Sequence, residues 1–343
     1  MLTLGYIGSG KSVHRYHLPF VLQRSHLKVK TIFSPHAKST KWEKVKSINY
    51  SEDENDIFLD SEIDLIVVCS GVETHFDYAL KALEHNKHVL VEKPFTVTLN
   101  QAKILFEKAK EKGLFIECYQ NRRYDSDFLT VQKVIESGQM GDLLELEMHF
   151  DYYRPEIPTQ IDTLPFHLGY FYGHACHSLD QVISYFGKPD RLVYDVRSLL
   201  GANRMNDYFD VDLFYGNFKV SIKSSFFRLK ERPSFVLYGK KGVFIKQSKD
   251  RQEEHLKQFI MPDQPFFGID EEDHYGVLTT IDNNQVHEMR VKSEIGDYGR
   301  VYDAIYNHLV LRKERVVKPE QTLLVMEILE KGKEALCPRS NQL

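Results

Sequence analysis

The sequence predicts an α/β protein: a doubly wound parallel sheet followed by an α+β domain with a large, mostly antiparallel open sheet. Two observations lead to this prediction. In the first 120 residues, short apolar runs alternate with segments whose apolar residues recur at helical spacing. From residue 121 onward, period-two runs separated by glycine turns take over. We therefore expect one domain at residues 1–120 and a second at residues 121–343.

Five apolar runs in the first domain have the length and composition of buried parallel strands. They cover residues 2–7, 27–33, 64–69, 88–92 and 114–119. Phe76, Ala79 and Leu83 share one face of a helix that is expected to end at Asn86. A second helix follows Thr98, which begins a capping-box pattern, and Gly113 is expected to end it.

The second domain alternates apolar and polar residues with the period of half-buried strands. The predicted strands cover residues 144–150, 208–215, 217–227, 234–238 and 243–247. Helices are expected at residues 128–136, 175–186 and 301–309. Aromatic residues occur on both faces of these strands, which indicates that one face packs against another subunit.

Composition excludes several functional classes. Hydrophobic residues make up 42% of the chain, charged residues 27%, and the net charge is −4, so neither a nucleic-acid nor a membrane partner is expected. The N-terminal residues lack the features of a signal peptide. The cysteines Cys69, Cys118, Cys176 and Cys337 have no paired spacing. We expect reduced thiols in a cytoplasmic protein.

The first strand leads into Gly8-Ser9-Gly10-Lys11, which resembles the start of a dinucleotide-binding fingerprint. Such glycines let the backbone approach a pyrophosphate near a helix N-terminus, as in a Rossmann domain. Val13 takes the place of the third glycine. Because Pro19 would kink a helix that ran unbroken from Gly10, we expect the main helix to start near Pro19 after an extended loop.

The same segment also satisfies a P-loop pattern, with Gly5 followed by Gly10-Lys11-Ser12. Two features argue against an NTPase. The apolar run continues past Gly5 to Ile7, and the acid of the later strand, Asp64, stands at its start and not at its end. A glycine-rich turn without a ligand remains an alternative for either pattern.

The end of the second predicted strand bears on the choice of cofactor. NAD-binding Rossmann domains place an acid there to bond the ribose 2′-hydroxyl. This chain has Ser34, His36 and Lys38 instead, whose side chains suit a 2′-phosphate. NADP(H) is therefore favoured, NAD(H) is the second choice, and a solvated basic loop is the alternative.

Val89-Leu90-Val91-Glu92-Lys93-Pro94 is the second landmark. With the glycine loop, it makes the chain similar to the Gfo/Idh/MocA oxidoreductase family, which contains glucose–fructose oxidoreductase and inositol dehydrogenase. Residues 119–125, 150–155 and 296–300 resemble a subgroup with scyllo-inositol dehydrogenases and uncharacterised bacterial oxidoreductases.

The resemblance implies that Lys93 lies beside the nicotinamide and exchanges a proton with the substrate oxygen. A surface lysine at the start of a loop is the alternative. Pro94 is a candidate for a cis peptide bond. Asn121 and Arg122 are expected on the nicotinamide side. Together, the residues expected to bind the cofactor are Gly8, Ser9, Gly10, Lys11, Ser34, His36, Lys38, Ser70, His75, Glu92, Lys93, Asn121 and Arg122.

The third landmark is the segment from Gly173 to Gln181. By resemblance, His177 is the general acid/base and Asp180 lies near the substrate, whereas Gly173 stands where family members carry an Asp. A solvated helix face is the alternative. Arg154 is a candidate for binding substrate oxygens with its planar guanidinium, or else a surface arginine. The substrate-binding prediction is thus Lys93, Arg154, His177 and Asp180.

These observations predict an enzyme that transfers a hydride between NADP(H) and a secondary alcohol or ketone of a sugar, inositol or related polyol. We expect no metal, because neither His14 with His17 nor His174 with Cys176 and His177 has further ligands at recognisable spacing. The resemblance implies a homodimer or homotetramer. The rival hypothesis is a catalytically silent NADP-binding sensor of the same fold, and Gly173 is the residue that supports it.

Overall fold

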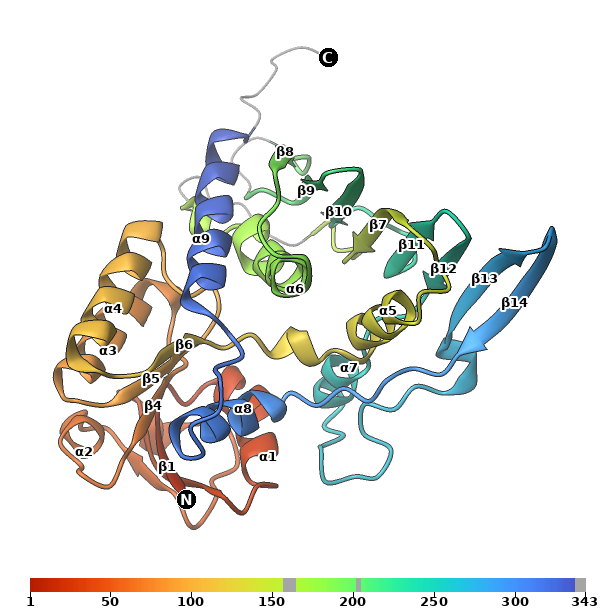
Figure 1. Ribbon diagram of the computed structural model, residues 1–343. Helices are drawn as coiled ribbons and strands as arrows, with labels where there is room; N and C mark the ends of the chain where they lie inside the picture. The colour runs from red at the N-terminus through yellow and green to blue at the C-terminus, as the bar shows by residue number, and fades with distance from the viewer. Residues whose placement is uncertain (157–164, 202–204, 337–343) are drawn as a thin grey trace. The chain divides into compact units, whose positions relative to one another are not determined.

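The computed structural model describes residues 1–156, 165–201 and 205–336, so Cys337 lies outside the described residues. The chain forms two compact units (Figure 1). The first unit contains Met1–Asn121, Glu253–Phe267 and Asp297–Met326. The second contains Arg122–Gln252, Gly268–Gly296 and the described residues from Glu327 onward. Each unit is therefore assembled from segments that are far apart in the sequence.

The first unit is built on a parallel sheet with strand order β3-β2-β1-β4-β5-β6. The strands are β1 (Leu2–Ile7), β2 (Leu27–Phe33), β3 (Asn49–Ser51), β4 (Leu65–Val68), β5 (His88–Val91) and β6 (Ile116–Cys118). This is the order of a doubly wound Rossmann sheet, as the sequence predicts. The strand order reverses between β1 and β4, which marks the edge where such folds bind ligands.

Helices cover both faces of this sheet. Figure 1 shows α3 and α4 side by side along one face and α1 and α8 along the other. The helices of the unit are α1 (Leu18–Val21), α2 (Asn55–Phe58), α3 (Val72–Glu84), α4 (Leu99–Lys112) and α8 (Arg300–Leu309), with a short 3₁₀ turn at Ala37–Ser39. The capping box of α4 forms as predicted, and Gly113 ends that helix at φ 64°.

The predicted extended loop before Pro19 is wrong. The chain is helical from Lys11 to Val21, and its middle, Val13–His17, is a π-helix. The N–H of Leu18 bonds to the carbonyl of Val13, five residues earlier. In a continuous α-helix the ring of Pro19 would clash with the carbonyl four residues before it. The wider π turn avoids this clash, so the helix starts directly at the glycine loop.

The second unit contains a mixed sheet with strand order β14-β13-β12-β11-β7-β10-β9-β8. The strands are β7 (Leu143–His149), β8 (Arg191–Arg197), β9 (Tyr208–Tyr215), β10 (Phe218–Ser225), β11 (Phe235–Gly239), β12 (Gly242–Lys246), β13 (Gly276–Asp282) and β14 (Gln285–Val291). Among these described strands, β7 and β10 pair in parallel and the other neighbours are antiparallel. This confirms the predicted large, mostly antiparallel sheet.

Helices α5 (Ser126–Glu136) and α6 (Cys176–Phe186) cover one face of this sheet (Figure 1). Leu146 of β7 and Leu237 of β11 are paired across the sheet and fully buried. Shorter helical turns lie at Phe166–Leu168, Phe171–Ala175 and Glu272–His274. The sequence predicted five of the eight strands of this sheet and missed β8, β13 and β14.

Three further helical segments lie where the chain passes from one unit to the other. They are a 3₁₀ turn at Asn121–Tyr124, α7 (Gln252–Lys257) and α9 (Pro319–Glu334). Leu256 of α7 and Tyr298 pack against Phe20 in the core of the first unit. The helix predicted at residues 301–309, which we assigned to the second domain, is α8 of the first unit. In the part of the chain that the structure describes, every helix is too short or too polar to span a lipid bilayer.

Candidate active site

The candidate site begins at the carboxyl edge of the parallel sheet. Because the strands of the first unit run in parallel, their C-terminal ends meet at one edge. The glycine loop follows β1, Ser34 follows β2, Ser70 follows β4 and Glu92-Lys93 follows β5. The structure thus brings together the predicted residues of the first unit at the edge where the strand order reverses.

The glycine loop has the geometry needed to hold a pyrophosphate. Gly8 has φ +112°, and a Cβ atom there would lie 2.6 Å from the carbonyl oxygen of Cys69. A Cβ atom on Gly10 would meet nothing within 4 Å, so there is open space at this position. A helix begins directly after this loop, at Lys11, and the N-terminus of a helix is a favourable place for an anion. Gly5 lies inside β1, which argues against the P-loop alternative.

The loop after β2 supports the glycine loop from the side. The Thr40 hydroxyl donates to the carbonyl oxygen of Ser9 at 3.1 Å. The Ser34 hydroxyl accepts the N–H of His36 at 3.2 Å, which tightens the turn after the strand. The side chains of His36 and Lys38 are exposed. No acid stands at the end of β2, as the sequence indicated.

His75 is placed differently from a direct cofactor ligand. Its side chain is only 1% exposed, with Nδ1 2.9 Å from the Pro94 carbonyl and Nε2 3.2 Å from the Ser70 carbonyl. Burial lowers the pKa of His75 below its usual value, against the opposing effect of Glu92. The imidazole therefore connects the loop after β4 to the loop after β5. The peptide bond between Lys93 and Pro94 is cis.

The Glu92 carboxylate accepts several hydrogen bonds from neighbouring residues of the site. Its Oε1 accepts hydrogen bonds from the Ser12 hydroxyl and from His17 Nε2, the latter at 3.0 Å. Its Oε2 accepts the backbone N–H of Lys93 at 3.0 Å. Burial raises the pKa of Glu92, but the hydrogen bond from His17, the electrostatic interactions with His17 and Lys93 and the hydrogen bond from Ser12 outweigh it and lower the pKa to about 2. Glu92 is therefore ionised at neutral pH.

His17, Cys69 and Glu92 form a cluster of potential metal ligands, with their ligand atoms within 4.8 Å of one another. Burial and the negative charge of Glu92 raise the pKa of the Cys69 thiol well above its usual value. His17 Nε2 lies 3.0 Å from Glu92 Oε1 and 3.5 Å from Cys69 Sγ, so contacts of His17 join the three residues.

In the second unit, His177 and Asp180 lie on α6. Asp180 is 1% exposed, and both its carboxylate oxygens accept hydrogen bonds from the Arg123 guanidinium at 2.7 Å. This bidentate pair ties α6 to the 3₁₀ turn at Asn121–Tyr124. The pairing supports a structural role for Asp180 in holding α6, upon which His177 is carried.

The remaining predicted residues lie near aromatic side chains. Arg122 donates to Asp125 at 3.1 Å, and its guanidinium lies 4.7 Å from the ring centre of Phe150. The Arg154 guanidinium lies 4.2 Å from the ring centre of Tyr152. Asn121 is buried. Both arginines are thus held by cation–π contacts within the second unit.

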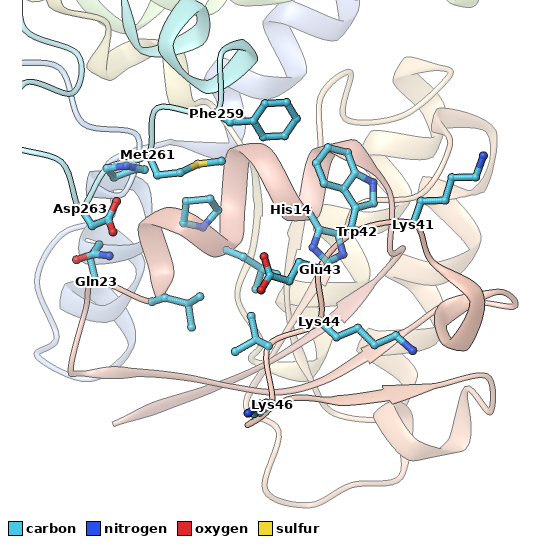
Figure 2. Close-up of a pocket in the computed structure, with 15 residues that line it drawn as sticks. His14, Gln23, Lys41, Trp42, Glu43, Lys44, Lys46, Phe259, Met261 and Asp263 are labelled. Atoms are coloured by element: carbon cyan, nitrogen blue, oxygen red, sulfur yellow. The ribbon is translucent and has the colours of Figure 1, made fainter.

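A cavity of about 950 Å³ opens beside α1 in the first unit (Figure 2). Leu18 and Met261 contribute apolar walls, and Trp42 stacks on His14 with ring centres 5.4 Å apart. Burial lowers the pKa of His14 to about 4, so its ring is neutral at pH 7. Among the described residues, those that line the cavity include none of the predicted cofactor or catalytic residues.

Sequence reasoning missed the residues that hold Glu92. His17 was considered only as half of a possible metal pair, and Ser12 only as part of the P-loop pattern. Tyr302, which contacts His17, comes from α8. No sequence signal connects Tyr302 to His17 across so long a separation.

A glycine loop at the switch point of a parallel sheet, with a lysine after β5, defines a dinucleotide-binding α/β oxidoreductase. Two family models match the chain: "Oxidoreductase family, NAD-binding Rossmann fold" over residues 2–119 and "Oxidoreductase family, C-terminal alpha/beta domain" over residues 132–339. The chain belongs to the Gfo/Idh/MocA family of oxidoreductases.

Individual relatives support the same conclusion. The chain is 46% identical over 341 residues to the uncharacterized oxidoreductase YhhX of Escherichia coli K12, covering 98% of both chains. An oxidoreductase crystal structure from Bacillus cereus matches with TM-score 0.92 and 39% identity, covering 99% of this chain and 97% of that one. The scyllo-inositol 2-dehydrogenase (NADP(+)) IolW of Bacillus subtilis is 27% identical over 335 residues, 97% of this chain and 93% of that protein.

Proposed function

We propose that the protein transfers a hydride between NADP(H) and a secondary alcohol or ketone of an inositol, a sugar or a related polyol. The observation that carries this proposal is the placement of Lys93 at the carboxyl end of β5, with its backbone N–H bonded to the ionised Glu92. The full-length similarity to a scyllo-inositol 2-dehydrogenase supports the substrate class.

The chemistry divides between the cofactor and the protein. A bound nicotinamide supplies the hydride acceptor or donor. The glycine loop and the N-terminus of the helix at Lys11 hold the pyrophosphate. The Lys93 amine exchanges the proton of the substrate oxygen, and His177 is the second proton carrier that the family resemblance suggests. Arg154 is proposed to bind substrate oxygens through its planar guanidinium.

Turnover of a substrate panel tests this proposal. Nicotinamide absorbance is followed with inositols, aldoses and sugar acids, with NADP and with NAD, for the wild type and for Lys93→Met. Turnover that collapses in Lys93→Met supports the proposal, while turnover that survives refutes the assignment of Lys93. Lys103→Met is the matched control, because Lys103 is exposed on α4. Tight NADPH binding without turnover of any substrate would favour the sensor hypothesis.

Lys38 offers a separate test of the cofactor. Its exposed ammonium follows β2 and suits a 2′-phosphate through a charge-assisted hydrogen bond. We expect Lys38→Glu to lower kcat/KM for NADP by about tenfold or more, the value of one such bond. The kcat/KM for NAD should change much less. Equal losses with both cofactors would contradict the preference for NADP.

We also propose that the protein forms a homodimer or homotetramer through the outer face of the second unit's sheet. Strand register places Tyr238 opposite Val243 and Val236 opposite Ile245, on the face away from the buried Leu237. Tyr238 is 42% exposed and Ile245 is 39% exposed. Tyr238→Glu combined with Ile245→Glu should convert the oligomer to a monomer, as measured by light scattering. A monomeric wild type would refute the proposal.

A further inference from the structure

A chain of buried hydrogen bonds connects α8 to the active-site carboxylate of the first unit. The Tyr6 and Tyr302 hydroxyls are 2.9 Å apart, and the Tyr302 hydroxyl is 2.5 Å from His17 Nδ1. His17 Nε2 is 3.0 Å from Glu92 Oε1. His17 is fully buried, and its ring lies 4.1 Å from the ring of Tyr119, centre to centre. The histidine is thus fixed both by its hydrogen bonds and by aromatic packing.

The ionised Glu92 fixes the hydrogen at one end of this chain. A carboxylate can only accept, so His17 Nε2 carries a hydrogen and donates it to Glu92. Burial raises the pKa values of Tyr6 and Tyr302 well above the usual value, so both keep their hydroxyl hydrogens. In the Nε2–H tautomer of His17, Nδ1 accepts the hydrogen of Tyr302. The Tyr302 hydroxyl oxygen then accepts from Tyr6.

Glu92 passes this constraint to two functional segments. Its Oε1 also accepts from the hydroxyl of Ser12, two residues beyond Gly10 of the glycine loop. Its Oε2 accepts the N–H of Lys93. The same carboxylate therefore fixes the start of the helix that receives the pyrophosphate and the backbone that carries the proposed catalytic lysine. The Glu92 carboxylate is only 12% exposed, so these protein donors, and not water, are its hydrogen-bond partners.

We propose that His17 is a positioning residue for the reaction: held by Tyr302, it donates to Glu92 and so fixes the backbone of Lys93 relative to the glycine loop. This inference rests on the proposed function for its kinetic consequences. It adds a residue outside the Glu-Lys-Pro signature, and it gives α8 a role in the site of the first unit. Tyr302 acts on Glu92 indirectly, because it helps to determine which ring nitrogen of His17 carries the hydrogen.

Loss of His17 should change the pH dependence of the reaction. The groups that act on Glu92 are His17, Lys93 and Ser12, which favour its ionised form, and it in turn acts on Cys69, Tyr119 and His75. Removing His17 removes the two largest effects that lower the pKa of Glu92, so Glu92 binds a proton at higher pH. A protonated Glu92 holds the Lys93 N–H less strongly. The acidic limb of the kcat profile should therefore move to higher pH.

The central experiment compares His17→Phe with His17→Gln, whose side-chain amide retains an N–H donor. We expect His17→Phe to lower kcat by about 10- to 100-fold, the scale of a misplaced reacting group, with an acidic limb that appears at higher pH. His17→Gln should recover part of kcat and move the limb back. His255→Phe is the matched control, because His255 is a buried histidine of α7 that packs against Phe267.

Tyr302→Phe keeps the inference testable if His17→Phe does not fold, since it removes a single hydroxyl. Nitrogen NMR of histidine-labelled wild type should show His17 as the Nε2–H tautomer, and Tyr302→Phe should shift the Nδ1 resonance. The inference fails if kcat and the pH profile of His17→Phe match the wild type, if His17→Gln is as impaired as His17→Phe, or if His17 carries its hydrogen on Nδ1. The NMR result requires no turnover, so it separates this inference from the proposed function.

Discussion

Arg123 and Asp180 form a buried, two-pronged ion pair, with both N–O distances at 2.7 Å. Each side chain is at most 8% exposed. The sequence predicted that Asp180 binds substrate, but its carboxylate is paired with Arg123 of the 3₁₀ turn at Asn121–Tyr124. Breaking such a pair is costly because the surviving partner is left charged and buried.

Asp180→Asn should therefore lower the free energy of unfolding by about 3–5 kcal/mol, measured by urea denaturation. Asp142→Asn is the control, because Asp142 pairs with Lys240 at the surface at 2.8 Å, and no measurable change is expected there. A small effect of Asp180→Asn on stability, together with a large rise in substrate KM, would instead restore the substrate-binding role.

Gly173 tolerates a side chain, whereas Gly8 does not. A Cβ atom on Gly173 would meet nothing within 4 Å, and the residue is helical. Gly173→Ala should raise the free energy of unfolding by about 0.5–1 kcal/mol. Gly8→Ala should lower it by about 1–3 kcal/mol or more, through its positive φ and the close Cys69 carbonyl. Thermal unfolding of both variants checks this contrast.

Gly173→Asp restores the acid that family resemblance places four residues before His177. Because the position has room for a side chain, the variant should fold like the wild type. We expect its turnover to rise, since a carboxylate four residues before His177 can orient the imidazole ring. Turnover below that of the wild type would show that the glycine is required.

Asp127 gives stability a pH dependence in the second unit. Burial and the neighbouring Asp250 raise the pKa of Asp127 to about 7. The folded state thus holds a proton that the unfolded state has released, so stability is complete below about pH 4 and is lost as pH rises toward 7. In the wild type, the free energy of unfolding should fall between pH 5 and pH 8. This fall should be smaller in Asp127→Asn, as measured by urea denaturation at each pH. An unchanged difference would contradict the raised pKa.

The first unit should not fold from its N-terminal segment alone. Phe20 packs against Leu256 and Tyr298, and His17 bonds to Tyr302, all from later parts of the chain. A fragment of residues 1–121 would expose this apolar surface. We expect it to aggregate or to bind a hydrophobic dye, whereas the full chain does not. A cooperative urea transition of the isolated fragment would contradict this.

The sequence predicted five of the six strands of the parallel sheet, because a buried strand is a local signal, and missed the three-residue strand β3. Bounds such as Leu2–Ile7 and Leu27–Phe33 agree with the structure to the residue, since apolar runs between turns specify buried strands. The strand β14 was missed because most of its side chains are exposed, so its apolar pattern is weak. The prediction of an extended loop before Pro19 failed because a π turn accommodates a proline that a regular α-helix excludes.

The site was predictable where it follows strand ends and not where it depends on tertiary contacts. Glu92 and Lys93 stand in a recognisable signature directly after β5. The bond between His17 and Glu92 joins residues 75 positions apart, and the Arg123–Asp180 pair joins residues 57 apart. Residue spacing on one helix cannot show such partners. The sequence therefore predicted that Asp180 is available to bind substrate, whereas its carboxylate is paired with Arg123.

Trp42 gives the protein its own optical probe. It is the chain's single tryptophan, it stacks on His14 and it lines the cavity of Figure 2. Selectively excited tryptophan emission from the whole chain thus reports on one location in the first unit. Any molecule that enters this cavity meets the fluorophore directly. Quenching or a spectral shift on adding a metabolite would reveal occupancy without a label, and Trp42→Phe would supply the dark reference.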